Sequence, residues 1–183
     1  STLLLALGYT KSDMANEFYE KENFTYDSKI KKWKTKFNPE NYKTKNFYEE
    51  VVDAKTGKVL IALGEKVNFL NAKKLFNEGL KEIYVKSESL YGKFLHKDII
   101  IGEETFDIGV ELNDTILQQI IDANISTIEI STTNSINKGP YLLQTILIDK
   151  NKTKNDAINE IYKVLRPGEP PTIEIATQIF NNL

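Results

Sequence analysis

The strongest constraint on the fold is a pattern that the chain carries twice. Residues 61–86 and 106–131 align when the first stretch is moved forward by 45 positions (106 minus 61), so that Gly64 meets Gly109 and the apolar positions keep their spacing. The shared pattern is an extended segment, a glycine turn, a short helix and another extended segment. Any two strand–helix–strand units look alike at this level, but we favour the interpretation that the chain carries a true repeat. Either way, the pattern predicts two small units side by side, at about 58–87 and 103–132.

Each copy carries the residues that begin and end a short helix. Asn68 and Asn113 stand where an N-cap side chain accepts a hydrogen bond from the first free N–H groups of the helix. Gly79 and Asn124 stand where a helix ends in a left-handed residue, a conformation that glycine and asparagine tolerate best. Helices of about ten residues are marginal alone in water, so we expect the adjoining strands to stabilise them.

The rest of the chain mixes helical and extended patterns. Residues 23–37 predict a β-hairpin, because aromatic residues alternate with lysines on its second half. The predicted fold is therefore α+β: a small mixed domain of two repeated strand–turn–helix–strand units plus a β-hairpin. Further strands are expected at 47–52, 58–63, 94–101 and 141–148, and helices at 2–20, 156–165 and 173–183.

Composition excludes several classes of function. The 183 residues carry a formal charge of −2 and include no cysteine, which excludes disulfides, thiol catalysis and cysteine-ligated zinc. His96 is the single histidine, so no site built on several histidines can form, and neither Gly57-Lys58 nor Gly92-Lys93 has the spacing of a phosphate loop. No apolar run approaches the ~20 residues of a membrane-spanning helix. A small enzyme would need an acidic or lysine-based pocket, for which Glu103, Asp107 and Lys97 are the candidates.

The most basic stretch, residues 29–36, has two interpretations. Lys32, Trp33, Lys34 and Lys36 could bind a nucleic acid, since lysines attract phosphates and an aromatic ring stacks on bases. This would make the chain a free-standing nucleic-acid binding module. Alternatively, the stretch is an edge strand whose lysines face water and discourage pairing with other chains, which is the interpretation that we favour.

Near its end the chain carries an uncommon sequence, RPGEPPT at 166–172, which links two predicted helices. Together with Gly139-Pro140-Tyr141 and the stretch 6–10 (ALGYT), it resembles the lobe of the β subunit of bacterial DNA-directed RNA polymerase. The resemblance covers nearly the whole chain and is weaker around the hairpin at 23–37. Gly57-Lys58-Val59 and Gly92-Lys93 would lie in the segment that the family calls the external 1 domain.

The resemblance implies a division of the chain into three parts. Residues 1–22 would be the N-terminal part of the lobe, 23–138 the inserted external 1 domain, and 139–183 the C-terminal part of the lobe. The flanking helices would then come together, because the entry and exit of an inserted domain are usually close in space. The chain begins without methionine, so we expect it to be a piece of a longer protein.

The resemblance also implies a function without catalysis by this chain. The parent enzyme is a nucleotidyltransferase, but the family's magnesium-binding aspartates lie on β′ and its active-site lysines on a later part of β, so no cofactor is expected here. The lobe would help to line the downstream DNA channel, and the insertion would dock regulators that reach the secondary channel. The implied partners are the remainder of β, β′ and the other polymerase subunits, sigma factor and DNA, in the cytoplasm at the nucleoid, with no membrane partner.

Arg166 is the residue with the clearest implied role. The matching position in the family lies close to the DNA bubble, where an arginine can contact phosphates or base edges. Arg166 could instead pair with the helix dipole or with Glu169, three residues further on.

Overall fold

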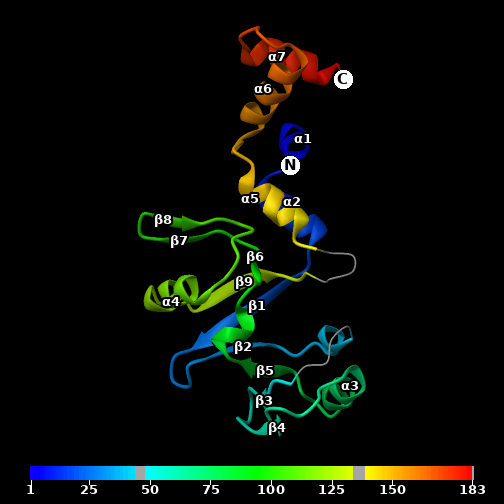
Figure 1. Cartoon of the computed structure of the whole chain (residues 1–183), viewed down its shortest axis with the longest axis vertical. Helices are drawn as coiled ribbons and strands as arrows, with labels where there is room; N and C mark the ends of the chain where they lie inside the picture. Colours follow the sequence, from blue (N-terminus) through cyan, green and yellow to red (C-terminus); the bar gives the residue numbers. More distant parts are fainter. Residues whose placement is uncertain (44–47, 134–138, 183) are drawn as a thin grey trace. The chain divides into compact units, whose positions relative to one another are not determined.

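The computed structural model describes residues 1–43, 48–133 and 139–182. Within these ranges the chain forms two compact units, which are described separately (Figure 1). The first unit comprises residues 1–21, 93–111 and 131–183, and the second comprises 22–92 and 112–130. The predicted division at 22/23 and 138/139 stays a prediction. Residue 138, Phe47 at the start of one expected strand and Leu183 at the end of the last expected helix lie outside the described ranges.

Helices dominate the first unit, and their apolar sides share one core. Met14 and Ile146 are fully buried there, next to Tyr162, which is 4% exposed. The last two helices pack against each other, and the first helix packs on the longer of them (Figure 1). The helices are α1 (Thr2–Ala6), α2 (Lys11–Phe18), α5 (Tyr141–Ile148), α6 (Lys154–Leu165) and α7 (Ile173–Asn181).

A second core of the first unit joins helices to short strands. Phe94 and Ile108 pack with Ala15, Tyr19 and Leu143. Two of the strands form an antiparallel pair in which residue 99 faces residue 106. The strands are β6 (Phe94–Leu95), β7 (Ile99–Ile101) and β8 (Glu104–Phe106).

The second unit is built around a sheet in the order β4-β3-β5-β2-β1-β9. Trp33 stands opposite Tyr26 on one side and Val85 on the other, and its side chain is completely buried. Because β2 lies between two strands, the interpretation of this stretch as an edge strand is wrong. The strands are β1 (Lys21–Asp27), β2 (Lys32–Lys36), β3 (Val51–Asp53), β4 (Val59–Ile61), β5 (Glu82–Val85) and β9 (Thr127–Ser131), of which Lys21 and Ser131 group with the first unit.

Short helices complete the second unit. Ala72 of α3 is fully buried in a core that also contains Phe37, Val51 and Ile83 from the sheet side. Leu117 and Ile120 are the buried residues of α4. The helices are α3 (Phe69–Asn77) and α4 (Asp114–Asp122), with two 3-10 turns, η1 (Pro39–Tyr42) and η2 (Ser87–Leu90).

The order of elements that the repeated pattern predicts is present in both copies: β4, α3, β5 and then β8, α4, β9. The second copy is not one small unit, however, because β8 pairs with β7 in the first unit while α4 belongs to the second unit. The side chains of Asn68 and Asn113 each accept a hydrogen bond of 2.9 Å from a backbone N–H three residues on. Gly79 (φ +109°) and Asn124 (φ +56°) adopt the left-handed conformation that ends each helix. The predicted α+β class is confirmed, as is the hairpin at 23–37.

Three predicted elements differ from the structure. The expected helix over 2–20 is two helices, because Gly8 takes φ +101° between them. The expected strand over 141–148 is the helix α5, in which Leu143 and Ile146 are buried while Tyr141 and Ile148 are each 77% exposed. A continuous apolar run does not distinguish a strand from a short helix, and here burial follows the helical spacing. The expected strand over 94–101 is interrupted between β6 and β7.

Candidate nucleic-acid interface

The turn between α6 and α7 has a defined backbone. At the end of α6 the backbone N–H of Arg166 donates to the carbonyl of Tyr162 (2.8 Å). Pro167 has no N–H to continue the helix, and Gly168 takes φ +92°, which lets the chain reverse. Thr172 then caps α7 by accepting from the backbone N–H of Ile175 (3.4 Å). The sequence RPGEPPT therefore folds as a bridge that presents Arg166 and Glu169 at one end of the helix pair.

One carboxylate oxygen connects the buried and exposed sides of this bridge. The hydroxyl of Tyr162 donates to Oε2 of Glu169 (3.1 Å), and Nη1 of Arg166 donates to the same oxygen (3.5 Å). The Arg166 and Glu169 side chains are 54% and 57% exposed. Burial, followed by the hydrogen bond to the Glu169 carboxylate, raises the pKa of Tyr162, while the Arg166 charge opposes this rise.

The Arg166 guanidinium has more donors than this contact uses. A guanidinium carries five N–H donors in a planar fork that matches the geometry of phosphate oxygens and of base edges. The pairing with Glu169 that the sequence suggested is present, and a pair so exposed contributes little, on the order of 0–1 kcal/mol. Arg166 is thus both paired and accessible to a further anion.

The lysines of the hairpin, unlike Arg166, lie on the face of a sheet. Lys32 donates to Oε1 of Glu50 (2.9 Å), which lowers the pKa of Glu50, and Lys34 pairs with Glu82 at 3.7 Å. Trp33 is buried on the other face of the strand, and its Nε1 donates to Oγ of Ser87 (3.1 Å). The structure therefore brings the lysines together on one face of the sheet but separates them from the aromatic ring.

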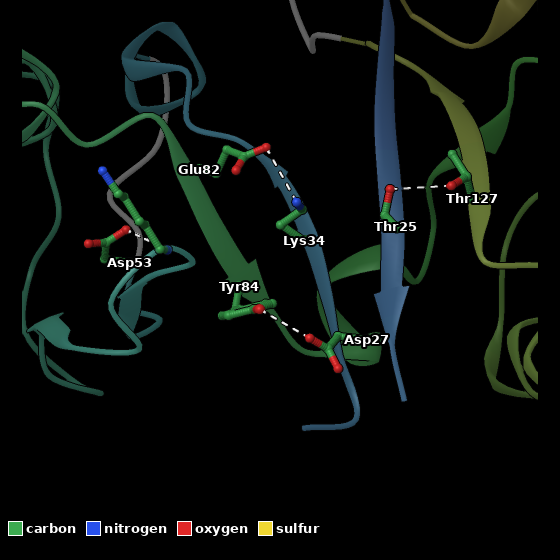
Figure 2. A network of polar contacts seen from close by, with 8 residues as sticks. Thr25, Asp27, Lys34, Asp53, Glu82, Tyr84 and Thr127 are labelled. Carbon is green, nitrogen blue, oxygen red and sulfur yellow. Dashed lines mark hydrogen bonds and ion pairs between the residues drawn. The ribbon is translucent and has the colours of Figure 1, made fainter. Parts of the chain in front are cut away.

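Figure 2 shows the polar face of this sheet, on which Lys34 points to Glu82 and Tyr84 to Asp27. The Tyr84 hydroxyl donates to Oδ2 of Asp27 (3.2 Å). Two lysines of the hairpin, Lys32 and Lys34, each have a carboxylate partner. Such a face attracts a phosphate backbone far less than an unpaired lysine stripe would.

Sequence reasoning missed two polar contacts of the first unit. Tyr162 donates to Glu169, which lies seven positions on and beyond the end of α6, so no helical spacing indicates this contact. His96 is 3% exposed and lies between Oγ of Ser131 (Nδ1, 2.9 Å) and Oδ1 of Asn16 (Nε2, 3.0 Å). His96 thus bridges segments that lie far apart in the sequence.

The candidates for an enzyme site do not line either of two hollows in the described part of the chain. In the second unit a pocket of about 310 Å³ is lined by charged, polar and apolar residues, including Glu49, Leu63 and Lys86. In the first unit a more open groove of about 460 Å³ runs along Leu7–Tyr9 and one side of α2. Glu103, Asp107 and Lys97 line neither of them.

Two further features are absent from the described part of the chain. Across residues 1–43, 48–133 and 139–182, no group of three or more His, Asp or Glu side chains is arranged to hold a metal ion. None of the helices in these same ranges combines the length and apolar character that crossing a membrane requires.

The chain is similar in sequence to several known proteins. No family model matches the chain. Over its whole length, however, the chain is 37% identical to the DNA-directed RNA polymerase subunit beta of Jannaschia sp. (strain CCS1). The identity is 36% with the subunit of Dinoroseobacter shibae and 35% with that of Rhizobium leguminosarum bv. trifolii.

Each of these relatives is the β subunit of a DNA-directed RNA polymerase. The chain is homologous to a segment of the bacterial RNA polymerase β subunit. It spans about 14% of the length of the curated relatives it matches.

Proposed function

We propose that the chain is the lobe of an RNA polymerase β subunit together with its inserted external 1 domain, and that it serves transcription without catalytic residues of its own. The observation that carries this proposal is the match of 100% of the chain to β subunits at 34–37% identity. The RPGEPPT bridge supports it further, because the turn presents an accessible arginine at the end of a packed helix pair.

In this proposal Arg166 contacts DNA in the assembled enzyme. Its guanidinium is half exposed and makes one long contact of 3.5 Å, so a phosphate can engage its remaining donors. The partners are the remainder of β, β′ and the other subunits, sigma factor and the downstream DNA. The magnesium of the parent enzyme belongs to other parts of it.

The predicted insertion at 23–138 is proposed to dock regulators. Its pocket of about 310 Å³ combines the apolar side chains of Leu63 and Val85 with the carboxylates of Glu49 and Glu88 and the ammonium group of Lys86. Because carboxylates outnumber the ammonium group in this lining, the surface suits a partner segment that carries a basic residue beside an apolar one.

The proposal is tested by the size of the native protein. An antibody raised against this chain is used to blot fractions of a density gradient prepared from the source cells. We expect a polypeptide several times larger than 20.9 kDa that sediments with transcription activity. A polypeptide of this mass that sediments alone would contradict the proposal and favour the free-standing binding module.

A further inference from the structure

We infer that Tyr162 and Glu169 are positioning residues for Arg166: the Tyr162 hydroxyl holds the Glu169 carboxylate, which in turn holds the guanidinium ready for a DNA phosphate. This inference rests on the proposed function, since it explains how the arginine of the bridge is presented. It begins from the shared oxygen Oε2 of Glu169, on which the Tyr162 and Arg166 contacts meet.

The anchor of this connection is rigid. Tyr162 is 4% exposed, and its ring belongs to the core formed with Leu5, Met14 and Ile146. A ring packed on several sides has few accessible rotamers, so its hydroxyl occupies a fixed place at the surface of the core. The hydroxyl therefore ties the exposed Glu169 side chain to the folded body of the first unit.

The connection reduces the entropy that Arg166 loses on binding. A free arginine side chain samples many rotamers, and ordering it at an interface opposes binding. The contact from Nη1 to Glu169 restricts the guanidinium while its remaining donors are available for a phosphate. The backbone also favours this geometry, because the N–H of Glu169 donates to the carbonyl of Arg166 (3.4 Å).

The variants that test the positioning role of Tyr162 and Glu169 must leave the charge of the bridge unchanged. Removing the Glu169 charge would strengthen DNA binding through general electrostatics, whatever its effect on Arg166. Tyr162→Phe removes one hydroxyl and keeps the ring, and Glu169→Asp keeps the charge on a shorter side chain that no longer spans both partners. Tyr19→Phe is the matched control, because Tyr19 is also buried and its hydroxyl donates to a distant acceptor, the Gly139 carbonyl (2.9 Å).

The experiment uses polymerase reconstituted with the full-length β subunit and measures the lifetime of open complexes on a promoter duplex after addition of competitor DNA. We expect Arg166→Ala to shorten the lifetime about tenfold, and Tyr162→Phe and Glu169→Asp about threefold each. Adding Tyr162→Phe to Arg166→Ala is expected to change nothing further, and Tyr19→Phe is expected to behave like the parent.

The outcomes separate the inference from the function on which it rests. If Arg166→Ala shortens the lifetime while Tyr162→Phe and Glu169→Asp do not, the positioning role is wrong and the DNA contact stands. If Tyr162→Phe acts equally with and without Arg166, or Tyr19→Phe has the same effect, the hydroxyl serves only the fold and the inference is wrong. If Arg166→Ala has no effect at any salt concentration, the DNA contact itself is wrong.

Discussion

Gly109 lies directly against the backbone of Leu143 in α5. A Cβ atom added to Gly109 would stand 2.5 Å from the Leu143 carbonyl oxygen, well inside the distance at which real Cβ atoms pack. Gly64, which occupies the same place in the first copy of the repeat, has nothing within 4 Å of such an atom. The two glycines share almost the same backbone conformation, with φ of +88° at Gly64 and +89° at Gly109.

This pair allows the cost of close approach to be separated from the cost of backbone conformation. We expect Gly64→Ala to lower the free energy of unfolding by about 1 kcal/mol, the strain of a left-handed alanine. Gly109→Ala is expected to cost roughly 3 kcal/mol, because α5 must also shift. Chemical denaturation of both variants checks this, and equal losses would show that α5 moves away freely.

We expect the two N-cap asparagines, Asn68 and Asn113, to stabilise the second unit by similar amounts. Asn68→Ala and Asn113→Ala each leave a helical N–H without its acceptor, and each is expected to destabilise the second unit by about 1 kcal/mol. Asn113→Asp keeps an acceptor at the N-terminus of α4 and serves as the control. Thermal unfolding followed by circular dichroism measures the differences. Full stability of both alanine variants would mean that other groups or water cap these helices.

We expect ionisation of the Tyr42 phenol to lower the stability of the folded chain at high pH. Burial, followed by the charges of Glu49 and Glu22, raises the pKa of Tyr42 to about 12 from its ordinary value of 10.0. The folded state thus favours the protonated phenol. Its contribution is fully present below about pH 10 and is lost as the pH rises from about 10 to about 12. At about pH 11 the loss is roughly 1 kcal/mol.

The measurement compares the parent with Tyr42→Phe, which cannot ionise at this position. Denaturation midpoints at about pH 9 and about pH 11 give the difference between the two proteins, so that other groups titrating in this range cancel. A steeper decline of the parent is expected. Parallel declines would show that Tyr42 reaches solvent readily.

The lysine hairpin is expected not to bind nucleic acid on its own. Lys32 and Lys34 have carboxylate partners, and Trp33 is buried, so neither a strong phosphate site nor a stacking platform is formed. Fluorescence anisotropy of the 183-residue chain with a labelled single-stranded DNA should show no micromolar binding. Binding with a steep salt dependence would instead support the free-standing module.

The features that sequence predicted well are those decided by neighbouring residues. The Asn68 and Asn113 caps and the left-handed Gly79 and Asn124 each depend on a few adjacent positions. The apolar run at 141–148 was assigned wrongly, because the packing of α5 determines which of its residues are buried. Local patterns therefore predicted where helices begin and end better than they predicted which elements pack against one another.

In the candidate site, too, a contact between residues close in sequence was predicted, whereas contacts that depend on how the chain folds were not. Glu169 was considered as a partner of Arg166, since the two lie three residues apart. The Tyr162 contact depends on how the Gly168 turn folds back on α6. The central place of β2 in the sheet depends on its pairing with β5, in which Val85 lies 52 positions beyond its partner Trp33 (85 minus 33). The alternation of aromatic residues and lysines in the hairpin could therefore not show that β2 has a neighbour on both sides.

The core shared by Phe94, Ile108, Ala15, Tyr19 and Leu143 has a consequence for how such a gene can change. Phe94 and Ile108 lie inside the stretch 23–138, whereas the other three lie in the segments on either side of it. A single deletion of the codons for 23–138 would remove two of these five side chains and expose the remaining three. Loss of that stretch during evolution would therefore require compensating substitutions at Ala15, Tyr19 and Leu143, because the flanking helices have adapted to what lies between them.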